Sequence, residues 1–213
     1  MNEKISISPV IEALETCFDR LNERFYNGEL ERTVITLSEG AKMRAYGWFV
    51  CAEVWHKDEN KACELNISSD YLKRDFMDIM RTLAHEMVHC YNYMQGIQDC
   101  ARGGSRHNKA FRDCAESHGM VWHKPETDDE KAYYKKYGYS DVRFSDEVTE
   151  EIEEMLSFAK EPLNLYRDET VKGTKKKSKT VFKYVCPCCG NSCRATKEIA
   201  IMCLDCDERM DIE

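Results

Sequence analysis

Two histidines and a glutamate stand in a pattern that could bind a metal ion and use it. His85, Glu86 and His89 occur in the order His-Glu-x-x-His. On a helix, residues four apart share one face, so both imidazoles can reach one ion while Glu86 stays beside it without binding it. A zinc hydrolase uses this arrangement to hold its ion and to take a proton from attacking water. The pattern is expected by chance only about 0.02 times in a chain of this composition, which disfavours a structural accident.

A catalytic zinc ion needs a third protein ligand and one open position. His107 follows a polar loop that contains Gly103 and Gly104 and directly precedes a predicted helix, so the chain can fold it back to the ion. Asp113 and Glu116 on that helix are rival ligands of the carboxylate kind. Spacing favours His107 and leaves both carboxylates open. We expect His118 and His123 at the surface or beside the site, and His56 in a turn.

Six of the twelve cysteines gather between residues 186 and 206. Four of them form two C-x-x-C pairs: Cys186 with Cys189, and Cys203 with Cys206. This spacing predicts a second zinc ion bound by four thiolates, which leaves no position for water and is therefore structural. So short a segment needs the ion to fold. Cys188 and Cys193 are predicted to be spectator thiols, although either could replace a ligand; a disulfide-bonded cluster is disfavoured in a reducing compartment.

The composition indicates a folded chain of one mid-sized domain plus an appendage. Hydrophobic residues make up 42% and charged residues 33% of the 213 residues, and 4 Pro and 10 Gly are too few for a disordered or fibrous chain. No stretch approaches the roughly 18 apolar residues of a membrane span, and no apolar run near the N-terminus resembles a secretory signal. We therefore expect an intracellular monomer, cytoplasmic or nucleoid-associated, that does not bind a membrane.

The elements that must position these groups follow from hydrophobic spacing. Apolar residues three and four apart predict four helices, over 9–27, 75–95, 108–118 and 148–158. The helix over 75–95 carries the metal motif. Stretches rich in β-branched and aromatic residues predict three strands: 33–37, 45–55 and 62–67. We expect an α+β fold in which a small antiparallel sheet accompanies a zincin-type metal-binding helix, followed by a C-terminal four-cysteine zinc ribbon.

Charge divides the chain into an acidic and a basic part. The net charge of −8 combines −11 over residues 1–170 with +7 over 171–200 and −4 over the last thirteen residues. We place the boundary near 165–180, with one domain over 1–170 and a basic linker and ribbon over 171–213. Basic and aromatic side chains alternate in the ribbon: Phe182, Lys183, Tyr184, Arg194 and Lys197. Lysines that follow phosphates and aromatics that stack on bases fit single-stranded nucleic acid, whereas a solvated linker is the alternative.

Several motifs together resemble one protein family. Residues 82–89 read TLAHEMVH, and His107 is followed four residues later by Phe111; upstream, residues 21–30 read LNERFYNGEL and residues 46–49 read YGWF. These features, with a ribbon after the core, resemble the SprT-like zinc metalloprotease family, to which Spartan belongs. The resemblance implies a zinc endopeptidase with His107 as the third ligand. Known members cleave proteins crosslinked to DNA in a DNA-dependent manner, which implies a DNA-bound protein as substrate.

One rival interpretation is a nucleic-acid-binding adaptor, in which the ribbon acts and the metal helix is inactive or structural. Glu86 favours the enzyme, because a purely structural site has no use for an unligated carboxylate. We also expect the edge of the strand over 46–55 to bind a substrate peptide by strand addition. The candidates for stabilising the oxyanion are four tyrosines: Tyr133, Tyr134, Tyr137 and Tyr139.

Overall fold

The computed structural model describes residues 5–40, 45–101, 103–167 and 181–213. The chain forms two compact units, Met1–Asp168 and Glu169–Glu213. The boundary predicted after residue 170 and the lysines of the predicted linker at 172–179 lie outside the described residues. Within the described parts of the chain, no helix is long and apolar enough to cross a membrane.

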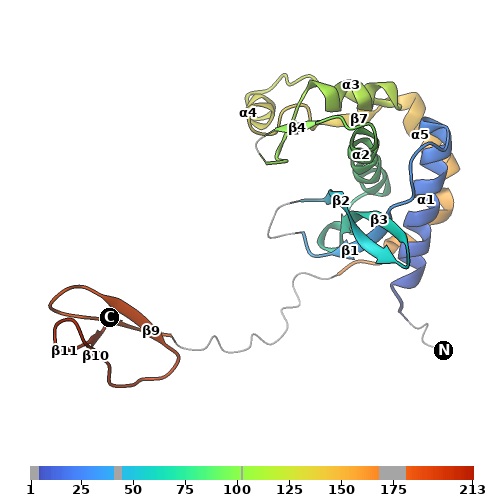
Figure 1. The fold of residues 1–213 in the computed structure, drawn as a ribbon. Coiled ribbons are helices and arrows are strands. Elements are labelled where there is room, and N and C mark those ends of the chain that lie inside the picture. Colours follow the sequence, from blue (N-terminus) through green and yellow to red (C-terminus); the bar gives the residue numbers. More distant parts are fainter. Residues whose placement is uncertain (1–4, 41–44, 102, 168–180) are drawn as a thin grey trace. The chain divides into compact units, whose positions relative to one another are not determined.

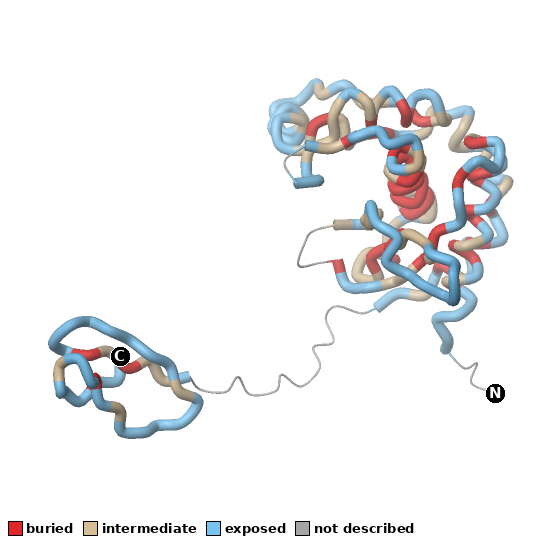
Figure 2. Tube along the Cα trace, viewed as in Figure 1, coloured by how far each residue is buried: buried red, intermediate tan, exposed pale blue. Residues whose placement is uncertain are grey.

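Two long helices form the centre of the first unit, and both lie within one residue of the predicted ranges. α1 (Ser8–Tyr26) ends at Asn27, whose left-handed backbone (φ 52°) stops the helix. α2 (Phe76–Met94) begins at Asp75, whose carboxylate accepts a hydrogen bond from the Met77 N–H. In Figure 1, α2 lies between the main sheet and α3 (Lys109–Ser117), and Figure 2 shows it buried along most of its length. The helix with the metal motif is therefore the core of this unit.

The main sheet has three strands in the order β1 (Val34–Ser38), β3 (Asn60–Ser68) and β2 (Gly47–Lys57). β2 and β3 form an antiparallel hairpin, but β1 pairs with β3 in parallel, so the predicted all-antiparallel sheet is wrong. The turn after Lys57 reverses the chain, which makes β3 run in the direction of β1. β3 has the most buried residues and takes the centre, because apolar side chains such as Leu65 need cover from both sides. β2 is left as an outer strand.

The rest of the first unit contains two further helices and two strand pairs. α5 (Asp146–Met155) confirms the helix predicted over 148–158, although it ends three residues early. α4 (Asp128–Tyr137) was not predicted. None of its residues is buried, so it has no apolar stripe that periodicity could detect. The paired strands are β4 (Cys100–Ala101) with β5 (Arg106–His107), and β6 (Met120–Trp122) with β7 (Val142–Phe144). Three single-turn 3-10 helices complete the unit: Ser69–Tyr71, Ser157–Ala159 and Pro162–Asn164.

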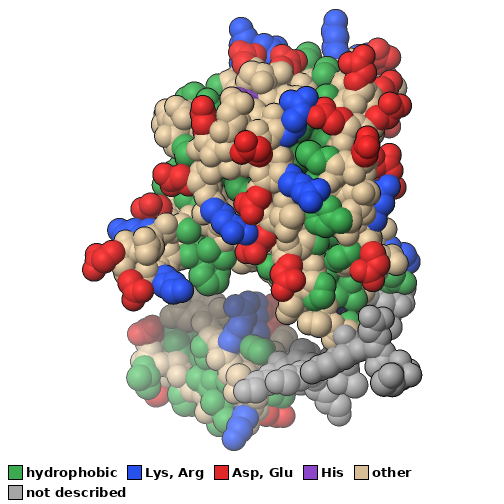
Figure 3. All heavy atoms as spheres, turned by 90° about the vertical axis from the view of Figure 1, so that its right-hand side faces the viewer, with side chains coloured by type: hydrophobic (Ala, Val, Ile, Leu, Met, Phe, Trp, Pro, Cys, Tyr) green, Lys and Arg blue, Asp and Glu red, His purple; other side chains and the backbone are tan. Residues whose placement is uncertain are grey.

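The face formed by α1 and α5 carries charges of both signs. Figure 3 shows acidic and basic side chains interspersed over it. Arg24 of α1 forms an ion pair with Glu151 of α5, and Arg32 lies 3.4 Å from Glu15. Exposed pairs of this kind contribute little to stability, so we assign this face the role of a solvated surface.

The second unit consists of short strands around a very small core. A three-stranded antiparallel sheet has the order β12 (Asp211–Ile212), β8 (Phe182–Val185) and β9 (Ser192–Ala195). A separate antiparallel pair consists of β10 (Met202–Cys203) and β11 (Glu208–Arg209). Its buried core has four members: Tyr184, Cys186, Cys203 and Met210. So little apolar burial gives weak support to a fold on its own.

Candidate metal centres

Three histidine side chains converge in the first unit. The Nε2 atoms of His85 and His89, one turn apart on α2, lie 3.0 and 3.1 Å from Nε2 of His107. Zn–N distances of about 2.0–2.1 Å in a tetrahedral site place two ligand nitrogens roughly 3.3 Å apart, so these three nitrogens fit around a single zinc ion with a small adjustment. Three protein ligands are one fewer than the four of a closed structural zinc site.

The two carboxylates that rivalled His107 lie elsewhere. Asp113 and Glu116 both face Arg112, at 2.5 and 3.7 Å, and their side chains are 52% and 43% exposed. Neither belongs to any of the described groups whose ligand atoms converge. Of the alternatives that spacing left open, the structure brings His107 to the helix.

His107 is held in place by backbone contacts from two directions. β5 pairs it with Cys100 of β4, and after α4 the chain returns to bridge it at Gly138. The Tyr139 N–H donates to the His107 carbonyl over 3.2 Å. Gly138 has a positive φ of 67°, and a Cβ there would lie 2.0 Å from the His107 oxygen. Only glycine fits this approach, because any side chain would collide with the ligand's own backbone.

The outer nitrogens of two ligands have hydrogen-bond acceptors. His89 Nδ1 lies 2.7 Å from Oδ2 of Asp99, and Asn92 Nδ2 donates to the same oxygen over 3.1 Å. His107 Nδ1 lies 3.3 Å from the Tyr137 carbonyl. With the proton on Nδ1, each ring presents a lone pair on Nε2, which is the tautomer that binds a metal. Sequence reasoning missed Asp99, since a carboxylate ten residues after His89 belongs to no motif.

Burial sets the charge states of the three rings. Burial and the neighbouring histidines hold the pKa of His85 well below its usual range, and burial lowers the pKa of His107 to about 4. Burial also lowers the pKa of His89, but the hydrogen bond to Asp99 and the nearby Glu86 outweigh it and raise the pKa overall. The neutral state of His85 and His107 is the one that can bind a metal ion.

Glu86 lies beside the three rings without joining them. Its side chain is buried with 5% exposure, and it is absent from the group of converging ligand atoms. Burial raises the pKa of Glu86 to about 7, whereas His89 and the backbone N–H of Phe49 on β2 lower it. β2 passes close to this point, because a Cβ on Gly47 would lie only 3.3 Å from Glu86 Cγ. A buried carboxylate of this kind can accept and return a proton.

The second unit gathers four cysteines. The sulfur atoms of these residues lie within 4.8 Å of one another: Cys186, Cys189, Cys203 and Cys206. The separation of 3.7 Å between Cys189 and Cys203 fits a tetrahedral site with Zn–S near 2.3 Å. Hydrogen bonding from the Cys189 backbone N–H lowers the pKa of Cys186 to about 7, which favours the thiolate. All twelve cysteines are described and none forms a disulfide; Cys188 and Cys193 are exposed and outside the group.

The aromatic residues of this unit do not alternate with the basic ones in space. Tyr184 is only 2% exposed, and its hydroxyl accepts a hydrogen bond from the Ile199 N–H. Phe182 packs against the same small core. The prediction that Tyr184 could stack on bases is therefore wrong. Successive side chains of a strand point to opposite faces, so the aromatics of β8 face the core and Lys183 faces outward.

The fold and the histidine centre define an α+β protein with a candidate catalytic metal site. A model of the SprT-like family matches residues 14–131, a range that contains His85, Glu86, His89 and His107. The chain belongs to the SprT-like family. Membership in this family implies a metalloprotease-type function. Neither the curated proteins nor the solved structures contain a match to this chain.

Proposed function

We propose that this protein is a zinc-dependent endopeptidase. The observation that carries the proposal is the convergence of His85, His89 and His107 beside Glu86, a buried carboxylate outside the ligand group. A structural zinc site takes four protein ligands and needs no such acid, so this arrangement favours hydrolysis over a purely structural role. The rival adaptor function has no use for it.

In this proposal each residue has a defined task. His85, His89 and His107 would hold the zinc ion, which supplies Lewis-acid polarisation of the scissile carbonyl and makes water more acidic. Glu86 accepts the proton from the attacking water and returns it to the leaving amine. Asp99 fixes the orientation of His89, because a hydrogen-bonded ring cannot rotate away from the ion.

The position of β2 supports a route for the substrate. β2 is the outer strand of the main sheet, and no other described strand pairs with its free edge. Its first residues lie against Glu86. We propose that an extended peptide adds to this edge, since unpaired backbone N–H and C=O groups offer ready hydrogen bonds.

The decisive variant is Glu86→Gln, measured on an unstructured protein such as casein. We expect the cleavage rate to fall about 10²- to 10⁴-fold, the usual contribution of a general base. Zinc content should stay at two ions per chain, because Glu86 is not a ligand. Glu12→Gln, on the exposed side of α1, is the matched control and should cleave normally. Cleavage at the wild-type rate by Glu86→Gln would remove the proposal.

We further propose that the second unit is a zinc ribbon that contacts single-stranded nucleic acid and so directs cleavage to DNA-bound proteins. Lys183 lies directly opposite Arg194 in the β8–β9 ladder. Like charges in opposite positions destabilise a sheet, and an anion between them relieves the repulsion. The Glu213 carboxylate already pairs with Lys183, and in this proposal a phosphate group lies between Lys183 and Arg194. The sequence has five further lysines between residues 172 and 179, which lie outside the described residues.

This second proposal is tested by the double variant Lys183→Ala and Arg194→Ala in the full chain. We expect its affinity for single-stranded DNA to fall and the slope of log affinity against log salt to decrease by about 2, one for each lost phosphate contact. The matched control is Lys57→Ala with Lys61→Ala, in the β2–β3 hairpin. Unchanged, salt-dependent binding by the ribbon variant would contradict the proposal.

A further inference from the structure

A pocket of about 380 Å³ lies in the first unit, lined by residues of α2, α4, β6 and β7. Arg81 lines it from α2, one turn before His85 and on the same face of that helix. Gly138 lines it from the other side, and its backbone is bridged to His107. The pocket therefore shares α2 with His85, and it shares the backbone of Gly138 with the segment that holds His107.

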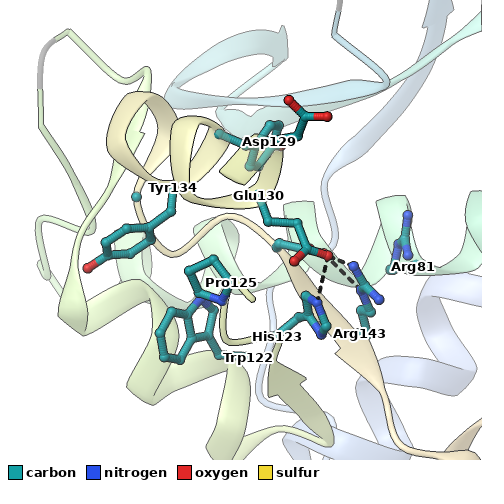
Figure 4. Close-up of a pocket in the computed structure, with 11 residues that line it drawn as sticks. Arg81, Trp122, His123, Pro125, Asp129, Glu130, Tyr134 and Arg143 are labelled. Carbon is teal, nitrogen blue, oxygen red and sulfur yellow. Dashed lines mark hydrogen bonds and ion pairs between the residues drawn. The ribbon is translucent and has the colours of Figure 1, made fainter. Parts of the chain in front are cut away.

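The pocket has aromatic walls. Trp122 of β6 and Tyr134 of α4 have ring centroids 5.8 Å apart, and Pro125 and Tyr133 also line it. Figure 4 shows Trp122, Pro125 and Tyr134 along one side and Arg81 along the other. Flat rings at this spacing favour a flat apolar guest, which can stack on one face or pack against a ring edge.

Three ion pairs hold most of the charged groups of the pocket, and Asp129 also lines it. His123 lies 3.1 Å from Glu130, as the dashed line in Figure 4 marks, and Arg143 lies 2.7 Å from Asp141. Arg81 lies 3.3 Å from Asp78 on its own helix. An anionic guest would have to displace one of these pairs and a cationic guest could pair with Asp129 alone, whereas an uncharged aromatic guest meets the rings without breaking any pair. The volume is at the small end of ligand pockets, which suits one large side chain.

We propose that this pocket receives an aromatic side chain of the peptide substrate, adjacent to the bond that is cleaved, and that Trp122 and Tyr133 determine this specificity. The proposal rests on the proposed peptidase function. Because Arg81 is one turn from His85 and Gly138 is bridged to His107, a guest in this pocket would lie on the side of the histidine centre that these two residues form. α4, which supplies Tyr133 and Tyr134, is thereby a substrate-binding element.

The first experiment measures specificity in peptides that differ only at the residues flanking the cleaved bond. Wild-type protein should cleave a peptide with Phe at one of these positions about 10- to 100-fold faster, in kcat/KM, than the same peptide with Ala. Trp122→Leu and Tyr133→Ala should both reduce this ratio. Tyr166→Ala is the matched control, because Tyr166 is 48% exposed and Tyr133 is 47% exposed, and it should keep the ratio. Should Trp122→Leu fail to fold, Tyr133→Ala decides the outcome.

A second experiment separates the pocket from the chemistry. Fluorescence anisotropy of labelled Phe and Ala peptides with the Glu86→Gln chain measures binding without turnover. We expect tighter binding of the Phe peptide, and loss of this difference on adding Tyr133→Ala. If wild-type protein cleaves nothing but this difference persists, the peptidase proposal fails and the pocket stands. The pocket proposal would be overturned by equal binding of both peptides or by an unchanged kcat/KM ratio in the variants. Displacement of the labelled Phe peptide by a nucleotide would also overturn it.

Discussion

The histidine centre lies inside the first unit, where α2 packs between the main sheet and α3, whereas the four-cysteine cluster lies in a unit whose core has four buried members. The histidines are oriented by groups around them, such as Asp99 and the Tyr137 carbonyl. The positions of the cysteines are set by two short turns and by the contacts among the cysteines themselves. The first unit has a large apolar core around its histidines, whereas the second has little buried apolar surface besides its cysteines.

In the proposed function this difference corresponds to two uses of zinc, one catalytic and one structural. Three ligands, a buried acid and a rigid surround suit catalysis, because the ion keeps a position for substrate and the geometry is fixed beforehand. Four thiolates in a small unit suit structure, because binding free energy becomes folding free energy.

The largest expected effect is on the second unit after loss of its ion. Cys203→Ser removes one of four thiolates, and the ion contributes on the order of 10 kcal/mol to such small folds. We expect backbone NMR signals of residues 181–213 to collapse to the random-coil region while those of α2 remain. Cys193→Ser is the control, since Cys193 is exposed and outside the cluster. Simultaneous loss of both sets of signals would show that the two units do not fold independently.

The next effect tests whether the first centre depends on its surround. Gly138→Ala would place a Cβ 2.0 Å from the His107 carbonyl at a φ of 67°, so His107 must move. We expect a loss of about 1–3 kcal/mol of unfolding free energy together with loss of the zinc ion at this centre. Gly96→Ala is the matched control, with the same φ and no atom within 4 Å of the new Cβ.

Both variants are compared by their unfolding free energy in denaturant and by their zinc content. Gly96→Ala should show only the backbone strain and keep both ions. If Gly138→Ala also keeps both ions, the backbone of Gly138 does not position His107, and the contrast between the centres weakens.

The smallest effect concerns the hydrogen bond to His89. Asp99→Asn keeps the size of the side chain but removes its charge, and loss of such a partner commonly weakens metal affinity 10- to 100-fold. We expect this decrease at the histidine centre and none at the cysteine cluster, measured by competition with a chelating dye. Asp113→Asn, on the exposed side of α3, should leave both affinities unchanged. Equal affinity in Asp99→Asn and wild type would show that packing alone orients the His89 ring.

Local sequence patterns predicted much of the fold. α1 and α2 were predicted within one residue, because their apolar faces repeat every three to four residues and their ends carry Asn27 and Asp75. α4 was missed because it has no buried face. The direction of β1 was also missed, because alternation identifies a strand but does not give its partner.

The sequence alone determined the chemistry that is available: two histidines one turn apart with an acid between them, and two pairs of thiols at metal-binding spacing. Spacing favoured His107 as the third ligand, but folding brought it to them, placed Asp99 and Gly138 against the rings and their backbone, and formed a pocket with aromatic walls in the same unit. The physical reason is distance along the chain. Helical spacing is a local property, whereas these contacts join residues that only packing brings together.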